Sequence, residues 1–246
     1  MTYFWIYPLL FLSSMVNIIV PISGSAVVTP LLSVPFGAKE AIALASFLFV
    51  ITGLFRIFLF RKHLKVSHIK NILPLSIVGA AIGALTFVRL DNLAITLLII
   101  GFLLIFLVRK VHNINRKGPL PAPKKITGHV VGFISGLVQG AGVTGGVDLR
   151  NGFLLSNNLT LQELNGTTAV IGTTNFAVAT LLRLYTNQIS FPDLTKVLWI
   201  LPLMFVAMLI GRKLTFHIGF KQQNYLAVFI LVFAIFMMLI SLFRII

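Results

Sequence analysis

The sequence contains no cysteine, and only five of its 246 residues are acidic. The absence of cysteine excludes disulfide bonds and any metal site built on thiolates. The acidic residues are Glu40, Asp91, Asp148, Glu163 and Asp193, so a mechanism that binds cations or protons depends on very few side chains. The chain also lacks a nucleophile elbow, a phosphate-binding loop and a zinc-protease motif, and its five histidines show no metal-ligand spacing. We therefore expect no cofactor, no bound metal and no enzymatic activity.

Charge of either sign is scarce: charged residues make up 10% of the chain and hydrophobic residues 58%. An ordinary soluble domain is about a quarter charged. This composition predicts an all-α, multi-pass membrane protein. Crossing the hydrocarbon core takes roughly 20 apolar residues in a helix. The segments that approach this length are 3–20, 41–60, 69–88, 93–108, 130–146, 169–185, 194–214 and 225–243. Two shorter apolar pieces, 25–35 and 152–156, suit half-helices or re-entrant segments.

The formal net charge is +15, and lysine and arginine concentrate in three loops, 61–70, 109–125 and 212–221. In a soluble protein such an excess suggests nucleic-acid binding. In a membrane protein it marks the loops on the cytoplasmic side, which is the interpretation adopted here. The polar stretch in the middle of the chain predicts a first repeat at 1–110, a basic cytoplasmic linker at 111–127 and a second repeat at 128–246. We expect no nucleic-acid partner and a location in the cytoplasmic membrane.

The two halves each contain a break in a hydrophobic stretch. The first reads Pro-Ile-Ser-Gly-Ser at 21–25 and the second Gly-Ala-Gly-Val-Thr-Gly-Gly at 140–146, and a constant offset of 122 aligns them. A broken backbone at membrane depth must find hydrogen-bond partners in protein or in a water-filled cavity. Such breaks at matching places in two repeats indicate a transport site.

Two topologies are compatible with these breaks. If each short piece completes a crossing, each half has five segments, the halves are inverted repeats, and all three basic loops share one side. If the breaks re-enter on the same side, eight spans form parallel repeats. The single-sided placement of basic loops favours the inverted arrangement.

Glycine-rich turns expose backbone N–H groups that can bind an anion, and helix N-termini add positive potential. A polar face of the span after the second break offers hydroxyl and amide donors. The predicted substrate-binding residues are Ser23, Gly24, Ser25, Ser46, Gly142, Thr144, Gly145, Gly146, Asn165, Thr167 and Thr168. The alternative for the polar face is hydrogen bonding between helices, and for Gly79, Gly83, Gly132 and Gly136 close helix packing is the favoured explanation.

Four charged residues near these segments are predicted to gate the site or shape its potential. Arg56 and Arg183 lie in apolar runs at similar places in the two halves, and intramembrane charge is costly enough to suggest function. The alternative is that both side chains reach the membrane surface. Asp148 and Arg150 follow the second break, where Asp148 could accept a proton, pair with Arg150 or cap a helix.

The residues of the two breaks resemble those of the sulfite exporter TauE/SafE family, also grouped as sulfonate and anion permeases. The resemblance covers nearly the whole chain. It rests on three features that occur in the same order in each half: a glycine-rich break, a Pro-Leu-Leu-like step and a small-residue opening of the next span. In the first half these lie at 23–24, 30–32 and 43–46, and in the second half at 142–146, 154–155 and 166–169. It implies a transporter built from two repeats that moves a sulfur-containing or organic anion such as sulfite, a sulfonate or sulfoacetate.

We therefore predict a secondary transporter that moves a small anion by alternating access, coupled to protons or Na⁺. A passive anion channel is the main alternative, and a membrane-embedded enzyme is a distant third.

Overall fold

The computed structural model describes residues 6–19, 25–113, 127–142, 145–215 and 220–244, and within these ranges all regular structure is helical. The linker 114–126 and the break residues 20–24 and 143–144 lie outside this description. The elements are α1 (Ile6–Ile19), α2 (Ser25–Phe36), α3 (Ala38–Phe60), the 3₁₀ turn η1 (Arg61–His63), α4 (Val66–Val88), α5 (Asn92–Asn113), α6 (Gly128–Gly140), α7 (Gly145–Ser156), α8 (Leu161–Tyr185), α9 (Phe191–Leu198), α10 (Leu201–Thr215) and α11 (Phe220–Phe243).

Four segments of the described chain are long and apolar enough to cross a membrane: α3 with η1, α4, α5 and α11. The helix α8 has 25 residues but carries the polar face noted in the sequence. Two of the expected spans are short, because α1 has 14 residues and α6 has 13. At 1.5 Å per residue each covers roughly 20 Å, less than the hydrocarbon core. The expected count of eight long spans is therefore not confirmed.

The segment expected as one span at 194–214 consists of two helices, α9 and α10. The chain turns at Trp199 and Ile200, two residues before Pro202. Proline has no N–H to donate to the Leu198 carbonyl, and its ring clashes with that carbonyl, so α9 cannot continue through it. Pro202 instead occupies the first turn of α10, where a missing N–H costs nothing.

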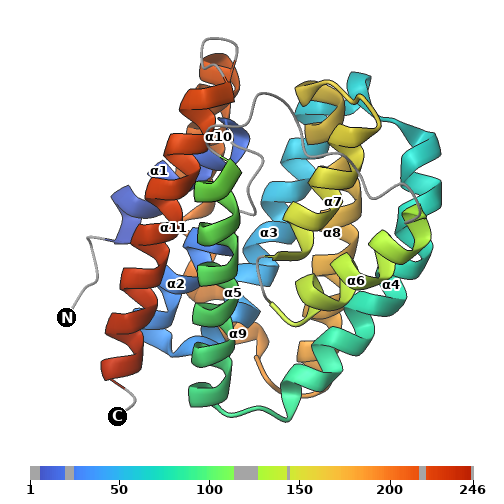
Figure 1. Ribbon diagram of the computed structural model, residues 1–246. Helices are drawn as coiled ribbons and strands as arrows, with labels where there is room; N and C mark the ends of the chain where they lie inside the picture. The colour runs from blue at the N-terminus through green and yellow to red at the C-terminus, as the bar shows by residue number, and fades with distance from the viewer. Residues whose placement is uncertain (1–5, 20–24, 114–126, 143–144, 216–219, 245–246) are drawn as a thin grey trace.

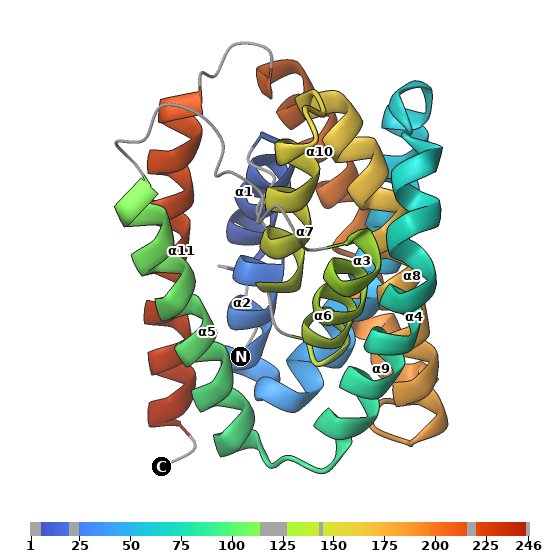
Figure 2. The same cartoon turned by 45° about the vertical axis from the view of Figure 1, so that its right-hand side comes forward.

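The long helices of the two halves run in opposite directions. In Figures 1 and 2, α5 rises from the α4–α5 turn at the bottom, whereas the neighbouring α11 descends to the C-terminus. The central helices α3 and α8 are also antiparallel, with Phe49 and Phe176 in ring contact at 5.0 Å. The ends of α3, α5 and α10 that carry the basic residues all lie at the top of Figure 1. Positive charge thus gathers at one end of the molecule.

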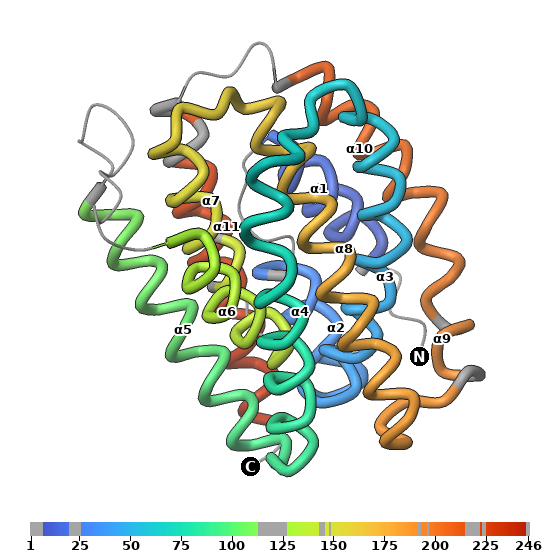
Figure 3. Tube along the Cα trace, turned by 90° about the vertical axis from the view of Figure 1, so that its right-hand side faces the viewer, coloured from blue at the N-terminus to red at the C-terminus, as the bar shows by residue number. Residues whose placement is uncertain are grey.

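Each half contains a pair of short helices that turns back within the molecule (Figure 3). The helix α6 descends beside α4, and α7 returns upward against α6. The helix α1 ascends along α10, so that Ile18 packs with Phe60 and Met208, while α2 descends to the start of α3. These pairs enter from opposite ends of the molecule. This arrangement differs from both topologies considered above, because the short helices turn back and yet the halves run in opposite directions.

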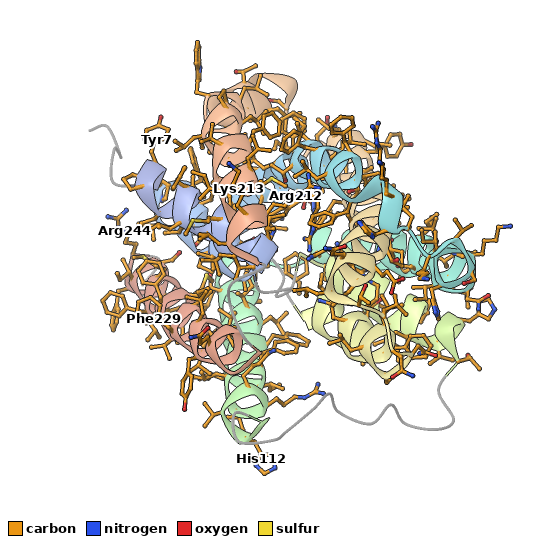
Figure 4. All side chains as sticks on the ribbon, turned by 90° about the horizontal axis from the view of Figure 1, so that it is seen from above. Tyr7, His112, Arg212, Lys213, Phe229 and Arg244 are labelled. Atoms are coloured by element: carbon orange, nitrogen blue, oxygen red, sulfur yellow. The ribbon has the colours of Figure 1, made fainter. Side chains whose placement is uncertain are left out.

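The outer surface of the helices is apolar. Figure 4, seen from above, shows Phe229 on α11 and Tyr7 on α1 pointing away from the helices, while Arg212 and Lys213 mark the upper end of α10. Phe229 is 69% exposed although it lies within an apolar span. Exposed apolar side chains of this kind are suited to lipid contact.

Glycines allow α6 to lie directly against α4. A side chain at Gly132 or Gly136 would overlap the backbone carbonyls of Ile72 and Ser76, and one at Gly79 would overlap that of Phe133. Close backbone approach through small residues is a common way in which membrane helices pack. The packing explanation for these glycines is confirmed.

We expect Gly136→Ala to destabilise the protein by about 1–3 kcal/mol, because a methyl group there overlaps the Ser76 carbonyl and forces α6 away from α4. The thermal midpoint of the purified protein in detergent, followed by size-exclusion chromatography, measures the effect. Gly101→Ala on α5 is the matched control, since its methyl group would meet no atom within 4 Å. The control should be neutral or slightly stabilising, because alanine favours helix. Equal midpoints for the two variants would contradict the packing assignment.

Candidate functional site

A hydrogen-bonded polar cluster joins four helices at mid-height. Ser76 on α4 lies close to the centre of that 23-residue helix and hydrogen bonds with the Asn175 amide of α8, with the Asn175 Nδ2 to Ser76 Oγ distance at 2.6 Å. Asn175 Nδ2 also donates to Gln139 Oε1 on α6 at 3.1 Å. Gln139 Nε2 donates to the carbonyl of Gly172 at 3.3 Å. The helix α4 is long and apolar enough to cross a membrane, and the cluster lies near its middle.

Arg150 of α7 completes the cluster. Its Nη1 donates to Gln139 Oε1 at 3.1 Å, and the side chain is 1% exposed. The Nε atom of Arg150 is buried and has no hydrogen-bond partner in the structure. A buried guanidinium with an unused donor is costly, and such groups normally pair or mark a functional site.

A second group of donors lies where α8 packs against α3, between Thr173 and Asn165 of α8. Arg56 of α3 donates through Nη2 to Asn165 Oδ1 of α8. Arg56 Nε, Asn165 Nδ2 and Thr173 Oγ1 are buried without a partner. Thr173 packs against Gly53, one turn along α3 from Arg56. The guanidiniums of Arg56 and Arg150 are close enough to repel each other electrostatically. Among the described residues, Arg56 donates to the amide oxygen of Asn165 and Arg150 to that of Gln139.

Arg183 of α8 has a different role. It is 1% exposed, and its two terminal nitrogens donate at 2.6 Å to Ser46 Oγ on α3 and to the carbonyl of Gly140. Gly140 is the last residue of α6, so its carbonyl lacks an intrahelical partner. The guanidinium therefore caps the broken end of α6 and places positive charge at the negative end of the helix dipole. Snorkelling to the surface, the alternative for this arginine, does not occur.

Several predicted donors are already used within the protein. The hydroxyls of Ser46 and Thr168 donate to the carbonyls of Ile42 and Leu164 in their own helices, at 2.7 and 2.8 Å. Thr167 Oγ1 accepts from the backbone N–H of Lys65 at 3.1 Å. The structure thus draws Asn165 into the donor group but gives these hydroxyls structural contacts.

The glycines of the second break allow a backbone conformation and a close helix contact that a side chain would prevent. Gly142 adopts a positive φ of 80°, and its N–H donates to the Gln139 carbonyl at 2.9 Å in a helix-ending turn. A side chain on Gly146 would overlap the Ser135 carbonyl. The helix α7 begins at Gly145, earlier than the expected 152–156, so Gly145 and Gly146 form its first turn rather than a loop. As in any α-helix, the first-turn N–H groups of α7 have no acceptor within the helix.

Some predicted residues fall outside the description. Ser23, Gly24 and Thr144 are not among the described residues, and Ser25 and Asp148 are described as helical backbone only. At the upper end of α8, Lys65 Nζ and Glu163 form an ion pair at 2.7 Å. Within the described residues, no group of histidines, cysteines or acids could hold a metal ion.

Gln139 and Ser76 were not predicted from the sequence. Each is an uncharged polar residue in a helix that also contains glycines, and the sequence gives no sign that the two share a partner. An amide directly before Gly-Ala-Gly at the end of an apolar run is the signal that could have identified Gln139. Buried amides in membrane helices find polar partners, because an unsatisfied group is costly there.

We expect Arg183→Met to lower stability by roughly 2–5 kcal/mol, because it leaves the Gly140 carbonyl and the end of α6 unpaired in a buried place. Arg183→Lys should recover part of this loss through one remaining charged donor. Arg61→Met, at an exposed site, is the matched control and should shift the thermal midpoint little. A midpoint for Arg183→Met equal to that of the control would refute the capping role.

Comparison with known proteins gives one match. A family model described as sulfite exporter TauE/SafE matches residues 6–242. No curated protein and no solved structure matches the chain significantly.

Proposed function

Because the chain belongs to the sulfite exporter TauE/SafE family, whose members are membrane transporters of sulfite or related anions, we propose that it is a secondary transporter that moves a small sulfur-containing or organic anion across the cytoplasmic membrane by alternating access. The family is one of transporters rather than enzymes. The alternating-access mechanism, the location in the cytoplasmic membrane and the position of the substrate site are the proposed parts.

The observation that carries the proposal is the surplus of buried donors between α3, α7 and α8. Arg56 and Arg150 each retain an unpartnered Nε, and Asn165 Nδ2 and Thr173 Oγ1 lie unpartnered beside them. Buried donors without acceptors are unfavourable unless a ligand supplies the acceptors. An anion supplies both oxygen acceptors and negative charge. The substrate site therefore comprises the side chains of this donor group, joined by the first-turn N–H groups of α7 at Gly145 and Gly146.

The halves at 1–110 and 128–246 are proposed to be inverted repeats, joined by a cytoplasmic linker at 111–127. Two features support this. The pairs α3 with α8 and α5 with α11 are antiparallel, and each member of a pair belongs to a different half. The packing of α1 on α10 corresponds to that of α6 on α4. In this arrangement three full crossings and one re-entrant pair make up each half. Movement of one half against the other would expose the site to each side in turn.

Coupling to a proton or Na⁺ gradient is part of the proposal. The chain holds only five acidic residues, and Asp148 is the one nearest the second break. Uptake that responds to an imposed pH or Na⁺ gradient would identify the coupling ion, and uptake indifferent to both would contradict coupling.

Flux in reconstituted vesicles tests the transport function. We expect saturable movement of sulfite or a sulfonate, and we expect Arg150→Met to reduce it at least about tenfold, because the variant removes a charged donor from the site. Arg61→Met, outside the site, should retain the flux. Flux that never saturates and appears as ionic conductance would favour a channel. No flux of any anion in a panel of sulfite, sulfonates and carboxylates would contradict transport itself.

The absence of cysteine makes the topology testable without removing native residues. Single cysteines replacing Lys62, Lys110 or Lys213 should react with an impermeant thiol reagent only from the cytoplasmic side. Cysteines replacing Asp91 or Asn187 should react only from the opposite side. Lys62, Lys213, Asp91 and Asn187 are solvent-exposed and Lys110 is partly exposed, so a lack of reaction would not arise from burial. Labelling of Lys213→Cys from the side opposite to Lys62→Cys would exclude the inverted arrangement.

A further inference from the structure

Resting on the proposed function, we propose that Gln139 is a positioning residue: its side-chain amide fixes the orientation of Arg150 and leaves one edge of that guanidinium for the substrate. Gln139 is the last residue but one of α6, and Arg150 lies in α7, the next helix of the chain. Both side chains are 1% exposed. Gln139 acts through Arg150 and needs no contact of its own with the anion.

Three contacts fix the amide of Gln139. Its Oε1 accepts from Asn175 Nδ2 and from Arg150 Nη1, each at 3.1 Å, and its Nε2 donates to the Gly172 carbonyl at 3.3 Å. The reverse orientation would place the amide hydrogens against two donors and the amide oxygen against a carbonyl oxygen. A single orientation therefore satisfies all the partners, and it presents an acceptor to Arg150.

Ser76 of α4 holds Asn175 in turn. The two side chains exchange hydrogen bonds, with Asn175 Nδ2 lying 2.6 Å from Ser76 Oγ and Ser76 Oγ lying 3.0 Å from Asn175 Oδ1. Both side chains are 0% exposed. Asn175 Nδ2 carries two hydrogens, and it donates one to Ser76 and one to Gln139. A chain of hydrogen bonds thus runs from α4 through α8 to the amide that holds Arg150.

The contact with Gln139 determines which edge of the Arg150 guanidinium stays available. Nη1 donates to Gln139, and Nη2 lies beside Gly172, where an added side-chain carbon would be 3.4 Å from it. Nε is buried without a partner. Nε and Nη2 form the edge through which arginine donates two parallel hydrogen bonds to neighbouring oxygens of one oxyanion. Gln139 therefore holds Arg150 by the nitrogen that lies outside this fork.

An amide suits this role because it is a neutral acceptor. A carboxylate in place of Gln139 would also accept from Arg150 Nη1, but it would form a buried ion pair and cancel the charge that attracts the anion. An apolar side chain would leave Nη1 without an acceptor and would release the guanidinium from its fixed orientation. A neutral acceptor of this length holds Arg150 in place and keeps its charge for a ligand.

Isothermal titration of the purified full-length protein in detergent with sulfite tests the assignment. We expect Gln139→Met, which has a similar length and no amide, to raise the Kd for sulfite at least about tenfold, because Arg150 loses its acceptor. Gln139→Glu should raise the Kd as well, because it neutralises Arg150. Ser135→Ala is the matched control, since it removes a buried hydroxyl that bonds only within α6, and it should bind sulfite as the unaltered protein does. An unchanged Kd in Gln139→Glu would overturn the proposal even if Gln139→Met failed to fold.

A double-mutant cycle separates positioning from a general disturbance of the cluster. In an Arg150→Met background, Gln139→Met should change the Kd by less than about twofold, because no guanidinium remains to be oriented. Arg150→Gln provides a second background that keeps a polar side chain at this buried place. The same tenfold loss on Gln139→Met with and without Arg150 would show that Gln139 acts independently, and it would refute the positioning role.

Flux measurements in vesicles separate the positioning role from the transport function. Saturable sulfite flux with the same half-saturation concentration in Gln139→Met and in the unaltered protein would leave transport intact and overturn the positioning role. A raised Kd in Gln139→Met, together with no sulfite flux by the unaltered protein, would support the positioning role and contradict transport.

Discussion

A helix that ends inside an apolar layer leaves carbonyl groups that must find donors, and this requirement organises the protein. The helix α6 ends at Gly140, where Arg183 of α8 supplies a charged donor. The same solution recurs elsewhere, since Lys39 donates to the carbonyls of Val88 and Leu90 at the end of α4, and Arg244 to that of Val34 near the end of α2. Cations at helix C-termini therefore link segments far apart in the sequence.

Close packing of α6 on α4 determines which polar groups meet. Glycines at Gly132, Gly136 and Gly140 bring the two backbones together, and α8 packs against both helices. Gln139, one residue before the end of α6, is thereby held between Asn175 and Arg150. Bulkier residues at these positions would separate the helices and leave the amides without partners. The polar cluster is thus a consequence of the glycine packing.

The sequence predicted the helical membrane class and the gathering of basic residues in a few loops, because these depend on composition and local pattern. Arg56, Arg150 and Arg183 could be singled out as candidates because charged residues are rare in this chain, and Asn165 because it lies on the polar face of an otherwise apolar segment. The partners of Ser46, Thr167 and Thr168 could not, because a hydroxyl on a helix can donate to its own backbone as readily as to a ligand. The division of the segment 194–214 was missed because Pro202 suits either a kink or a helix start.

The sequence by itself determined that the chain is a helical membrane protein and that most of its cations lie in a few loops, and it led to the prediction that two halves share a broken element. These properties follow from hydrophobicity and from residue order, which need no knowledge of contacts. Only the tertiary structure decided that Arg183 caps α6 while Arg56 and Arg150 keep unused donors. Arg150 and Arg183, which are 33 positions apart, carry the same charge in similar apolar surroundings. What separates their roles is which carbonyl or amide the neighbouring helices place within hydrogen-bonding distance.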